Sequence, residues 1–154
     1  MGWLIAKNLI PFLFVVVGLV QIRAYLRNLV QVHESESWPA SQGTVMSSWV
    51  HGETIDADGL TFGKYYPEVR YLYRVFGSEY QGNKIMFGSQ PAIQQSKAEA
   101  TISNYPEGSS VMVYYDPNQP SNAVLERNVS KALLASGVMT VACGIFIFVI
   151  FVPV

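Results

Sequence analysis

The segment from Ala132 to Val152 constrains the fold of this chain more than any other part of its sequence. It reads ALLASGVMTVACGIFIFVIFV and contains no charged residue. A helix of about twenty apolar residues matches a hydrocarbon core of roughly 30 Å. A buried helix of a soluble protein is a poor alternative, because no polar stripe interrupts the segment and a small core could not surround it. We therefore predict a transmembrane helix over residues 131–152.

A second apolar segment lies near the N-terminus, and it is shorter. Its uninterrupted part runs only from Leu9 to Val20, with Lys7 before it and Arg23 after it. A run of this length is also typical of the apolar region of a signal peptide. However, no small-x-small cleavage site follows, and a longer helix would place Lys7 and Arg23 near its ends, within reach of lipid headgroups. We predict an uncleaved transmembrane helix over residues 3–29.

Basic residues beside the two helices predict the orientation of the chain. Four of them lie on the side of the intervening segment, namely Arg23, Arg27, Arg127 and Lys131. Only Lys7 lies on the side of the termini. The positive-inside rule then predicts a cytoplasmic domain with both termini outside. In the alternative orientation the long intervening segment is translocated whatever its charge.

The composition supports a membrane protein and argues against nucleic acid as a partner. Of the 154 residues 50% are hydrophobic and 14% are charged, whereas a soluble domain has about 25% charged residues. The net charge of -1 provides no basic field for nucleic acid. The single cysteine, Cys143, excludes an intrachain disulfide and a CxxC motif. The lipid bilayer is therefore the partner that the composition predicts.

Between the two helices, residues 35–128 predict a β-rich polar domain. Alternation of apolar and polar residues is strongest from Tyr66 to Phe76, where Val69, Tyr71, Tyr73 and Val75 share one face. Gly77-Ser78 predicts a hairpin turn into a partner strand. The other predicted elements are strands over Thr44–Val50, Glu79–Phe87, Val111–Tyr115 and Ala123–Leu125, and a helix over Pro91–Tyr105. The glycine-rich and acidic stretch from His51 to Lys64 predicts a hairpin loop or mobile connection.

This order of elements predicts an α+β fold. It corresponds to a small antiparallel β-sheet or partly closed barrel with one helix, flanked by two transmembrane helices.

Several short motifs of the domain carry a family resemblance. They are Ser37-Trp38-Pro39-Ala40, Tyr71-x-Tyr73-x-Val75-x-Gly77, Tyr105-Pro106-x-Gly108 and Tyr114-Tyr115-Asp116-Pro117. In this order, over about residues 37–126, they resemble the domain of unknown function 3592 family. The resemblance implies a bacterial membrane protein with helices flanking the domain, and hence a multi-pass protein of the bacterial inner membrane. It implies no activity and assigns no functional residue.

The sequence predicts no enzyme and no cofactor. It has no GxSxG motif, no phosphate-binding glycine motif and no zinc motif. A third hypothesis is a hydrolase that uses carboxylates, with Asp116, which follows two tyrosines and precedes Pro117, as its candidate residue. The favoured interpretation is that one tyrosine fills the core and Asp116 caps a turn.

Two further groups of residues have side chains that suit a binding site. His51, Glu53, Asp56 and Asp58 lie close together in the sequence, as in oxygen-rich calcium loops, but the later carboxylates and the distal glutamate of such a loop are missing. No metal site is therefore predicted. Trp38-Pro39 could stack on a ligand, although a packing or interfacial role is favoured.

Small residues recur every four positions along the second apolar segment. They are Ala132, Ser136, Thr140 and Gly144. Such stripes let helix backbones approach closely in membranes. We predict a helix-packing interface here, and the sequence favours neither the first helix of the chain nor another subunit as its partner.

These features predict a membrane-anchored interaction or accessory protein, either a small subunit of a membrane complex or a homo-oligomer. The alternative is a ligand- or ion-sensing binding module at the membrane surface.

Overall fold

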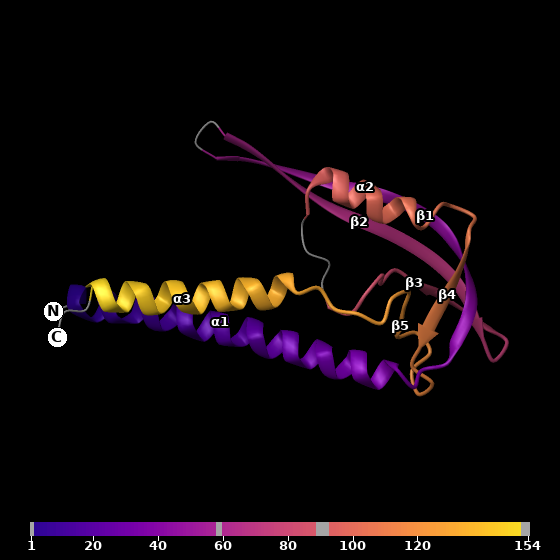
Figure 1. Cartoon of the computed structure of the whole chain (residues 1–154), viewed down its shortest axis with the longest axis horizontal. Coiled ribbons are helices and arrows are strands. Elements are labelled where there is room, and N and C mark those ends of the chain that lie inside the picture. The colour runs from indigo at the N-terminus through magenta and orange to yellow at the C-terminus, as the bar shows by residue number, and fades with distance from the viewer. Residues whose placement is uncertain (1, 58–59, 89–92, 152–154) are drawn as a thin grey trace. The chain divides into compact units, whose positions relative to one another are not determined.

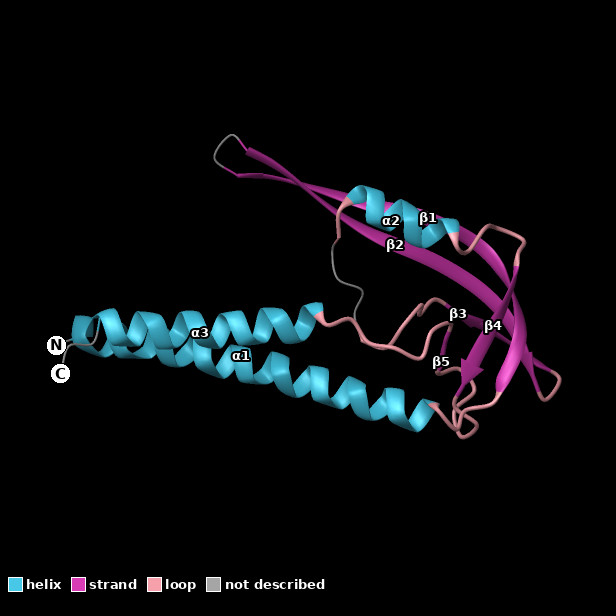
Figure 2. Cartoon of the chain, in the orientation of Figure 1, coloured by secondary structure: helices cyan, strands magenta, loops and turns pink. Residues whose placement is uncertain are grey.

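The structure is a computed structural model that describes residues 2–57, 60–88 and 93–151, with the side chains of residues 9–54, 63–88 and 93–150. The described elements are α1 (Gly2–Ser35), β1 (Ala40–Ala57), β2 (Leu60–Val75), β3 (Ser78–Gly82), α2 (Gln95–Ser103), β4 (Ser110–Tyr115), β5 (Ala123–Val124) and α3 (Ala132–Phe151) (Figure 1). The predicted α+β class is confirmed, with an open antiparallel sheet rather than a barrel (Figure 2). The chain divides into a helix unit, residues 1–30 and 131–154, and a sheet unit, residues 31–130.

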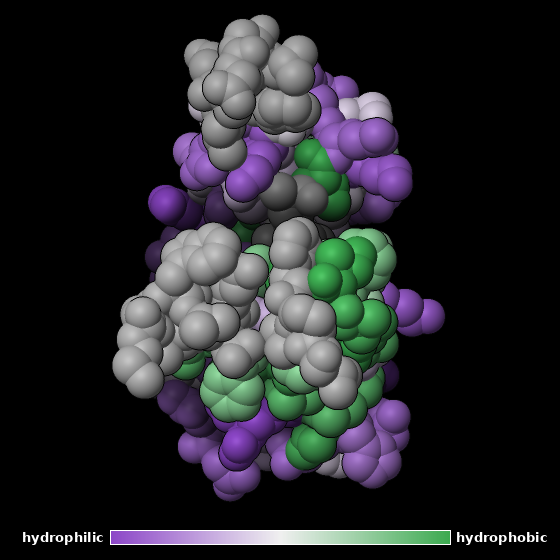
Figure 3. Space-filling model, turned by 90° about the vertical axis from the view of Figure 1, so that its left-hand side faces the viewer, coloured by the Kyte–Doolittle hydropathy of each residue, from purple (hydrophilic) through white to green (hydrophobic). Residues whose placement is uncertain are grey.

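Both long helices are apolar enough to span a membrane. The candidate spans are Leu9–Ser35 in α1 and Ala132–Ile150 in α3. Large apolar side chains of the two helices point outward, among them Phe12 and Met139, which are 66% and 67% exposed. Hydrophobic residues gather on the helices, whereas hydrophilic residues prevail over the sheet unit (Figure 3).

Glycines bring the backbones of α1 and α3 into direct contact. A Cβ atom on Gly18 would lie 2.8 Å from the Gly137 carbonyl oxygen, and one on Gly144 would lie 2.9 Å from the Pro11 carbonyl oxygen. Gly137 and Gly144 are seven residues apart, as are Pro11 and Gly18. The helices are therefore antiparallel and meet along a heptad-spaced seam of small residues.

The sheet has the strand order β3-β2-β1-β4-β5, and every pairing is antiparallel. The alternation predicted for β2 is confirmed, because Val69, Tyr71, Tyr73 and Val75 are all buried. Gly43 of β1 has no room for a side chain, since a Cβ atom there would lie 2.7 Å from the Leu72 carbonyl oxygen. The core side chains are those of Val45, Val69, Tyr71, Tyr73, Val75, Ile85, Tyr105, Val113, Tyr115, Ala123 and Leu125.

The prediction of a loop over His51–Lys64 is wrong. Strands β1 and β2 continue through this stretch, and their paired positions extend to Ala57 and Leu60. The two glycines that suggested a loop pack against an aromatic ring instead: Cβ atoms on Gly52 and Gly63 would lie 3.3 Å and 2.6 Å from the ring of Tyr65. An aromatic side chain that covers glycines in this way stabilises a strand pair. We call the paired segments His51–Ala57 and Leu60–Lys64 the ribbon; it extends beyond α2 (Figure 1).

The β2–β3 hairpin forms one residue earlier than predicted. Its two loop residues are Phe76 and Gly77, with φ angles of 50° and 81°, between paired Val75 and Ser78. Positive φ at both central positions is the geometry of a type I′ turn. Phe76 is 87% exposed, so an aromatic side chain occupies a left-handed position at a hairpin tip.

Strand β3 is shorter than the predicted partner strand Glu79–Phe87. It ends at Gly82, which lies against the ring of Tyr71, in a contact too close for any side chain. The following residues leave the sheet and bond to the segment that precedes α3. The backbone hydrogen bonds run from the Leu125 amide to the Lys84 carbonyl, from Glu126 to Ile85 and from Phe87 to Asn128.

Helix α2 is also shorter than predicted and begins at Gln95; Pro91 lies outside the described residues. Its Ala98 side chain is fully buried. The Ser48 hydroxyl of β1 donates a hydrogen bond to the Ile102 carbonyl, 3.4 Å away. The helix therefore covers the core side of the β1–β2 pair.

Candidate functional site

The face of the sheet opposite the core carries a group of aromatic, apolar and cationic side chains, two of them exposed and three half-buried. We call it the outer face and define it by Trp49, Tyr66, Arg70, Leu72 and Met112. On β2 and β4 they alternate with buried residues, and Trp49 of β1 pairs with Glu68 of the same β2 face, so their side chains emerge on the same side. The Arg70 guanidinium lies 5.2 Å from the centroid of the Trp49 ring. Met112 is 53% exposed.

This composition is typical of a protein-binding surface. Trp, Tyr, Met and Arg are enriched at interfaces, and Trp, Tyr and Arg dominate binding energy where they are buried by a partner. The charges beside the outer face are already paired in part, since Arg74 and Glu79 are 3.3 Å apart. A partner could therefore cover the face without leaving these two charges buried and unpaired.

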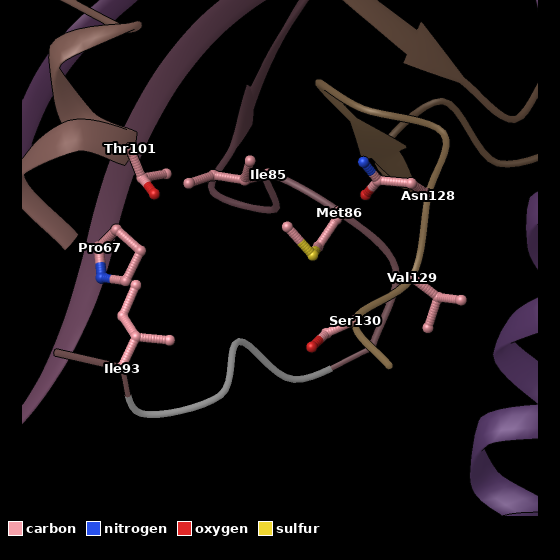
Figure 4. A pocket seen from close by; sticks show the side chains of 8 residues that line it. All are labelled: Pro67, Ile85, Met86, Ile93, Thr101, Asn128, Val129 and Ser130. Atoms are coloured by element: carbon pink, nitrogen blue, oxygen red, sulfur yellow. The ribbon is translucent and has the colours of Figure 1, made fainter. Parts of the chain in front are cut away.

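A pocket of about 260 Å³ lies on the core side of the sheet. The Met86 side chain extends into the space between Pro67 and Ile93 on one side and the 128–130 segment on the other (Figure 4). The lining residues are Pro67, Ile85, Met86, Ile93, Thr101, Asn128, Val129 and Ser130. Hydrocarbon side chains thus form most of its wall.

Buried tyrosines attach the irregular segment before α3 to the sheet. The Tyr71 hydroxyl lies 2.9 Å from the Lys84 carbonyl oxygen and 3.1 Å from that of Ala123. The Tyr73 hydroxyl donates to the Pro120 carbonyl at 2.6 Å. Burial, and secondarily the neighbouring Tyr73, raises the pKa of Tyr71, and burial likewise raises the pKa of Tyr73. These phenols serve as neutral structural donors.

Tyr105, just after the end of α2, is a third tyrosine whose hydroxyl bonds to the segment before α3. Its hydroxyl donates to Glu126 Oε1 at 2.6 Å, while the Asn128 side chain donates to Glu126 Oε2 at 2.8 Å. Burial raises the pKa of Tyr105, and the hydrogen bond to Glu126 and its charge add to the effect. The carboxylate is therefore engaged by two side chains.

Arg127 joins the first and last segments of the sheet unit. Its Nη1 atom donates to the carbonyls of Ser35 and Glu36 at 3.3 Å and 3.1 Å. Its guanidinium lies 4.2 Å from the ring centroid of Tyr114. A cation at the C-terminus of α1 also satisfies end carbonyls and complements the helix dipole.

Comparison with known protein families identifies most of the sheet unit. The family model described as "Domain of unknown function (DUF3592)" matches residues 41–130, more than half of the chain. The chain belongs to the DUF3592 family. Comparison with curated proteins returns no significant match.

The DUF3592 match covers the whole five-stranded sheet except the first residue of β1, together with α2. The family resemblance predicted from the tyrosine motifs is thus confirmed. In the structure these motifs are packing and turn elements: Tyr71 and Tyr73 lie in the core and Tyr115 is buried. The Asp116 carboxylate accepts a hydrogen bond from the Asn118 amide at 2.8 Å, which is the predicted turn cap.

The residues considered for calcium do not form a loop. His51 and Glu53 lie on β1, where both are about half exposed and 3.7 Å apart, and the backbone at Asp56 pairs with Thr61. In an extended strand residues 53 and 56 are about 10 Å apart along the backbone, whereas the ligands of a calcium loop come from a chain that curves around the ion. Asp58 lies outside the described residues. Among the residues that the structure describes, no three His, Cys, Asp or Glu side chains group as metal ligands.

Trp38 packs within the sheet unit. Its ring meets Phe87 edge-on, with the centroids 5.6 Å apart. This contact supports the packing interpretation. Because Phe87 belongs to the segment paired with residues 125–129, Trp38 helps to hold the start of the domain against its end.

The four residues of the predicted stripe lie at different depths in the helix unit. Gly144 is buried against α1, and Thr140 is half-buried, whereas Ala132 and Ser136 are exposed. The hydroxyls of Ser136 and Thr140 donate to backbone carbonyls within α3. Gly137, which is not in the stripe, makes the closest backbone approach to Gly18. Heptad spacing of glycines along α3 would have identified this seam in the sequence.

Two parts of the candidate site were missed by sequence reasoning. The pairing of Trp49 with Arg70 depends on a β-bulge at Met46, between Val45 and Ser47, which shifts the strand register by one residue. The pocket combines residues from β2, α2 and two connecting segments that are distant in sequence. No local pattern marks either feature.

Proposed function

We propose that this DUF3592 protein is a membrane-anchored interaction protein whose sheet domain binds a protein partner through the outer face. The partner is either a larger membrane protein, for which the chain acts as a small accessory subunit, or a second copy of the chain. The observation that supports this proposal is the gathering of five such side chains on one side of a well-packed sheet, where Arg70 and Met112 are exposed and Trp49, Tyr66 and Leu72 are half-buried. A rigid surface of this composition loses little conformational entropy on binding.

The proposal includes a multi-pass location. Helix α3 has twenty residues, which rise about 30 Å and match one hydrocarbon core. Helix α1 has thirty-four residues and a length of about 51 Å, so part of it continues beyond the bilayer. The excess of basic residues supports a cytoplasmic domain, and the family resemblance supports the bacterial inner membrane.

Site-specific photo-crosslinking in native membranes tests the interaction. A benzophenone amino acid replaces Met112 or Leu72, and a matched control replaces Glu99, which is exposed on α2. We expect adducts from the two outer-face positions and none from Glu99. In a Trp49→Ala, Arg70→Ala background the adduct yield should fall at least about tenfold, because interface hot spots contribute 2 kcal/mol or more.

The size of the adduct distinguishes the two kinds of partner. A product of twice the 17.1 kDa chain mass identifies a homo-oligomer, whereas another mass identifies an accessory subunit. Equal yields from Met112, Leu72 and Glu99 would contradict the proposal. A monomer at every concentration in mild detergent would contradict the homo-oligomer.

A further inference from the structure

We propose that the pocket around Met86 holds one acyl chain of a bilayer phospholipid. The proposal rests on the membrane anchoring proposed above and adds a ligand to the sheet domain. It follows from the lining of the pocket, its size, and its distance along the chain from α3.

The lining favours an apolar ligand. Pro67, Ile85, Met86, Ile93 and Val129 contribute hydrocarbon or thioether surface. Two of the polar side chains in the wall already have partners: the Thr101 hydroxyl donates to the Lys97 carbonyl at 2.9 Å, and the Asn128 amide donates to Glu126 at 2.8 Å. These bonds already use the Thr101 hydroxyl proton and one Asn128 N–H, and a hydrocarbon chain leaves both bonds intact.

The size of the pocket limits the ligand to one chain. Pockets for drug-sized molecules and cofactors occupy about 300–1,000 Å³, and this pocket measures about 260 Å³. It can therefore take a hydrocarbon segment but not a ring system with several substituents. Met86 is flexible and polarizable, which suits a ligand of variable conformation.

The position of the pocket in the chain brings it close to lipid. Ser130 lines the pocket, and α3 begins at Ala132. Two residues span at most about 8 Å, which is comparable to the headgroup layer on one side of a bilayer. Because the chain is continuous, Ser130 at the edge of the pocket lies within about 8 Å of the first residue of α3 in any arrangement of the two units. An acyl chain that bends toward the surface can reach it.

Lipid photo-labelling of the full-length protein tests this proposal. The protein is reconstituted into phosphatidylcholine vesicles that contain a phosphatidylcholine with a diazirine at the end of one acyl chain, and adducts are mapped by peptide mass spectrometry after irradiation. We expect adducts on α3, as the internal control for bilayer contact, and further adducts in the peptides that contain Met86, Ile93 or Val129.

Two tryptophan substitutions test whether the lipid adducts depend on the pocket itself. Met86→Trp fills the pocket and should lower its adducts about tenfold, whereas Glu107→Trp, at an exposed position outside the pocket and the outer face, should leave them unchanged. Thr101→Phe narrows the pocket from α2 and should repeat the loss, which guards against misfolding of the Met86 variant. The α3 adducts should persist in all three variants.

The remaining labelling results each contradict one specific proposal. Adducts on α3 without adducts in the pocket would overturn the lipid proposal and leave membrane anchoring intact. No adducts on α1 or α3 would contradict membrane anchoring itself. Pocket labelling by a free diazirine fatty acid, but not by the phospholipid, would overturn the proposal in favour of a soluble fatty-acid ligand.

Discussion

At the scale of single residues, three buried tyrosines determine how the sheet domain is closed. Tyr71, Tyr73 and Tyr105 each place a ring in the core and a hydroxyl on a polar group of the segment from Pro120 to Glu126. That segment has only the two-residue strand β5, so its own backbone pairing is limited. The phenols therefore supply much of the hydrogen bonding that holds it on the sheet.

The raised pKa values of these tyrosines predict a loss of stability in alkali. Below pH 10 the phenols are protonated in both the folded and the unfolded chain, and their full contribution is present. As the pH rises above about 10, the unfolded chain loses phenolic protons that the folded domain retains. The free energy of unfolding should therefore fall with pH from about 10 upward, as measured by chemical unfolding in one detergent at several pH values.

Tyr71→Phe removes both the hydrogen bonds of the Tyr71 hydroxyl and its ionisation in alkali, and stability measured at two pH values distinguishes the two effects. At neutral pH it should lower the free energy of unfolding by about 1–3 kcal/mol, because buried carbonyl groups lose a donor. Above pH 10 its stability should fall less steeply with pH than that of the original protein. Identical slopes for the two proteins would show that Tyr71 does not carry the alkaline transition.

Phe76 is the other residue with a clear energetic signature. Its φ angle of 50° is unfavourable for a residue with a Cβ atom, whereas Asn adopts it readily before Gly in a type I′ turn. Phe76→Asn should therefore raise the free energy of unfolding by about 1 kcal/mol. Gly77→Ala, at a φ of 81°, should lower it. Thermal unfolding of both variants checks the pair, and a less stable Asn variant would contradict the prediction.

At the scale of elements, the chain contains two different uses of glycine. In the helix pair, Gly18, Gly137 and Gly144 let backbones touch. In the ribbon, Gly52 and Gly63 make room for the Tyr65 ring. The first use creates a packing seam and the second preserves a strand, although glycine in isolation disfavours both elements. This is why the ribbon was predicted as a loop.

The glycine seam predicts a specific sensitivity in α3. Gly137→Leu would place a large side chain against Ile22 and the Gly18 carbonyl, and such overpacking costs about 1–3 kcal/mol. Ala142→Leu adds a similar volume at an exposed position and is the matched control. Detergent-induced unfolding followed by circular dichroism should show an earlier transition for the Gly137 variant alone. An equal effect of both substitutions would exclude the seam as the cause.

At the scale of the whole molecule, Arg127 has two roles. It was counted among the basic residues that predict orientation, and in the structure it also binds the carbonyls of Ser35 and Glu36. The contact also joins the residues that end α1 to the segment that leads into α3.

Cysteine accessibility tests the proposed orientation. In a Cys143→Ser background, Glu99→Cys on α2 should resist a membrane-impermeant maleimide in intact cells and react after permeabilisation. Gly2→Cys, near the N-terminus, should react without permeabilisation. The reverse pattern would place the sheet domain outside the cytoplasm.

The sequence by itself determined the two apolar helices, the α+β class and the family. Each depends on a local property that survives in any arrangement: a charge-free run, the alternation along β2, and short motifs in order. Tertiary structure decided the length of the β1–β2 hairpin, the α1–α3 seam, the outer face and the pocket. These depend on which residues meet across the fold, as Tyr65 meets Gly52 and Gly63, and as the bulge at Met46 sets Trp49 beside Arg70. Neighbours so distant in sequence are selected by packing, which local patterns do not encode.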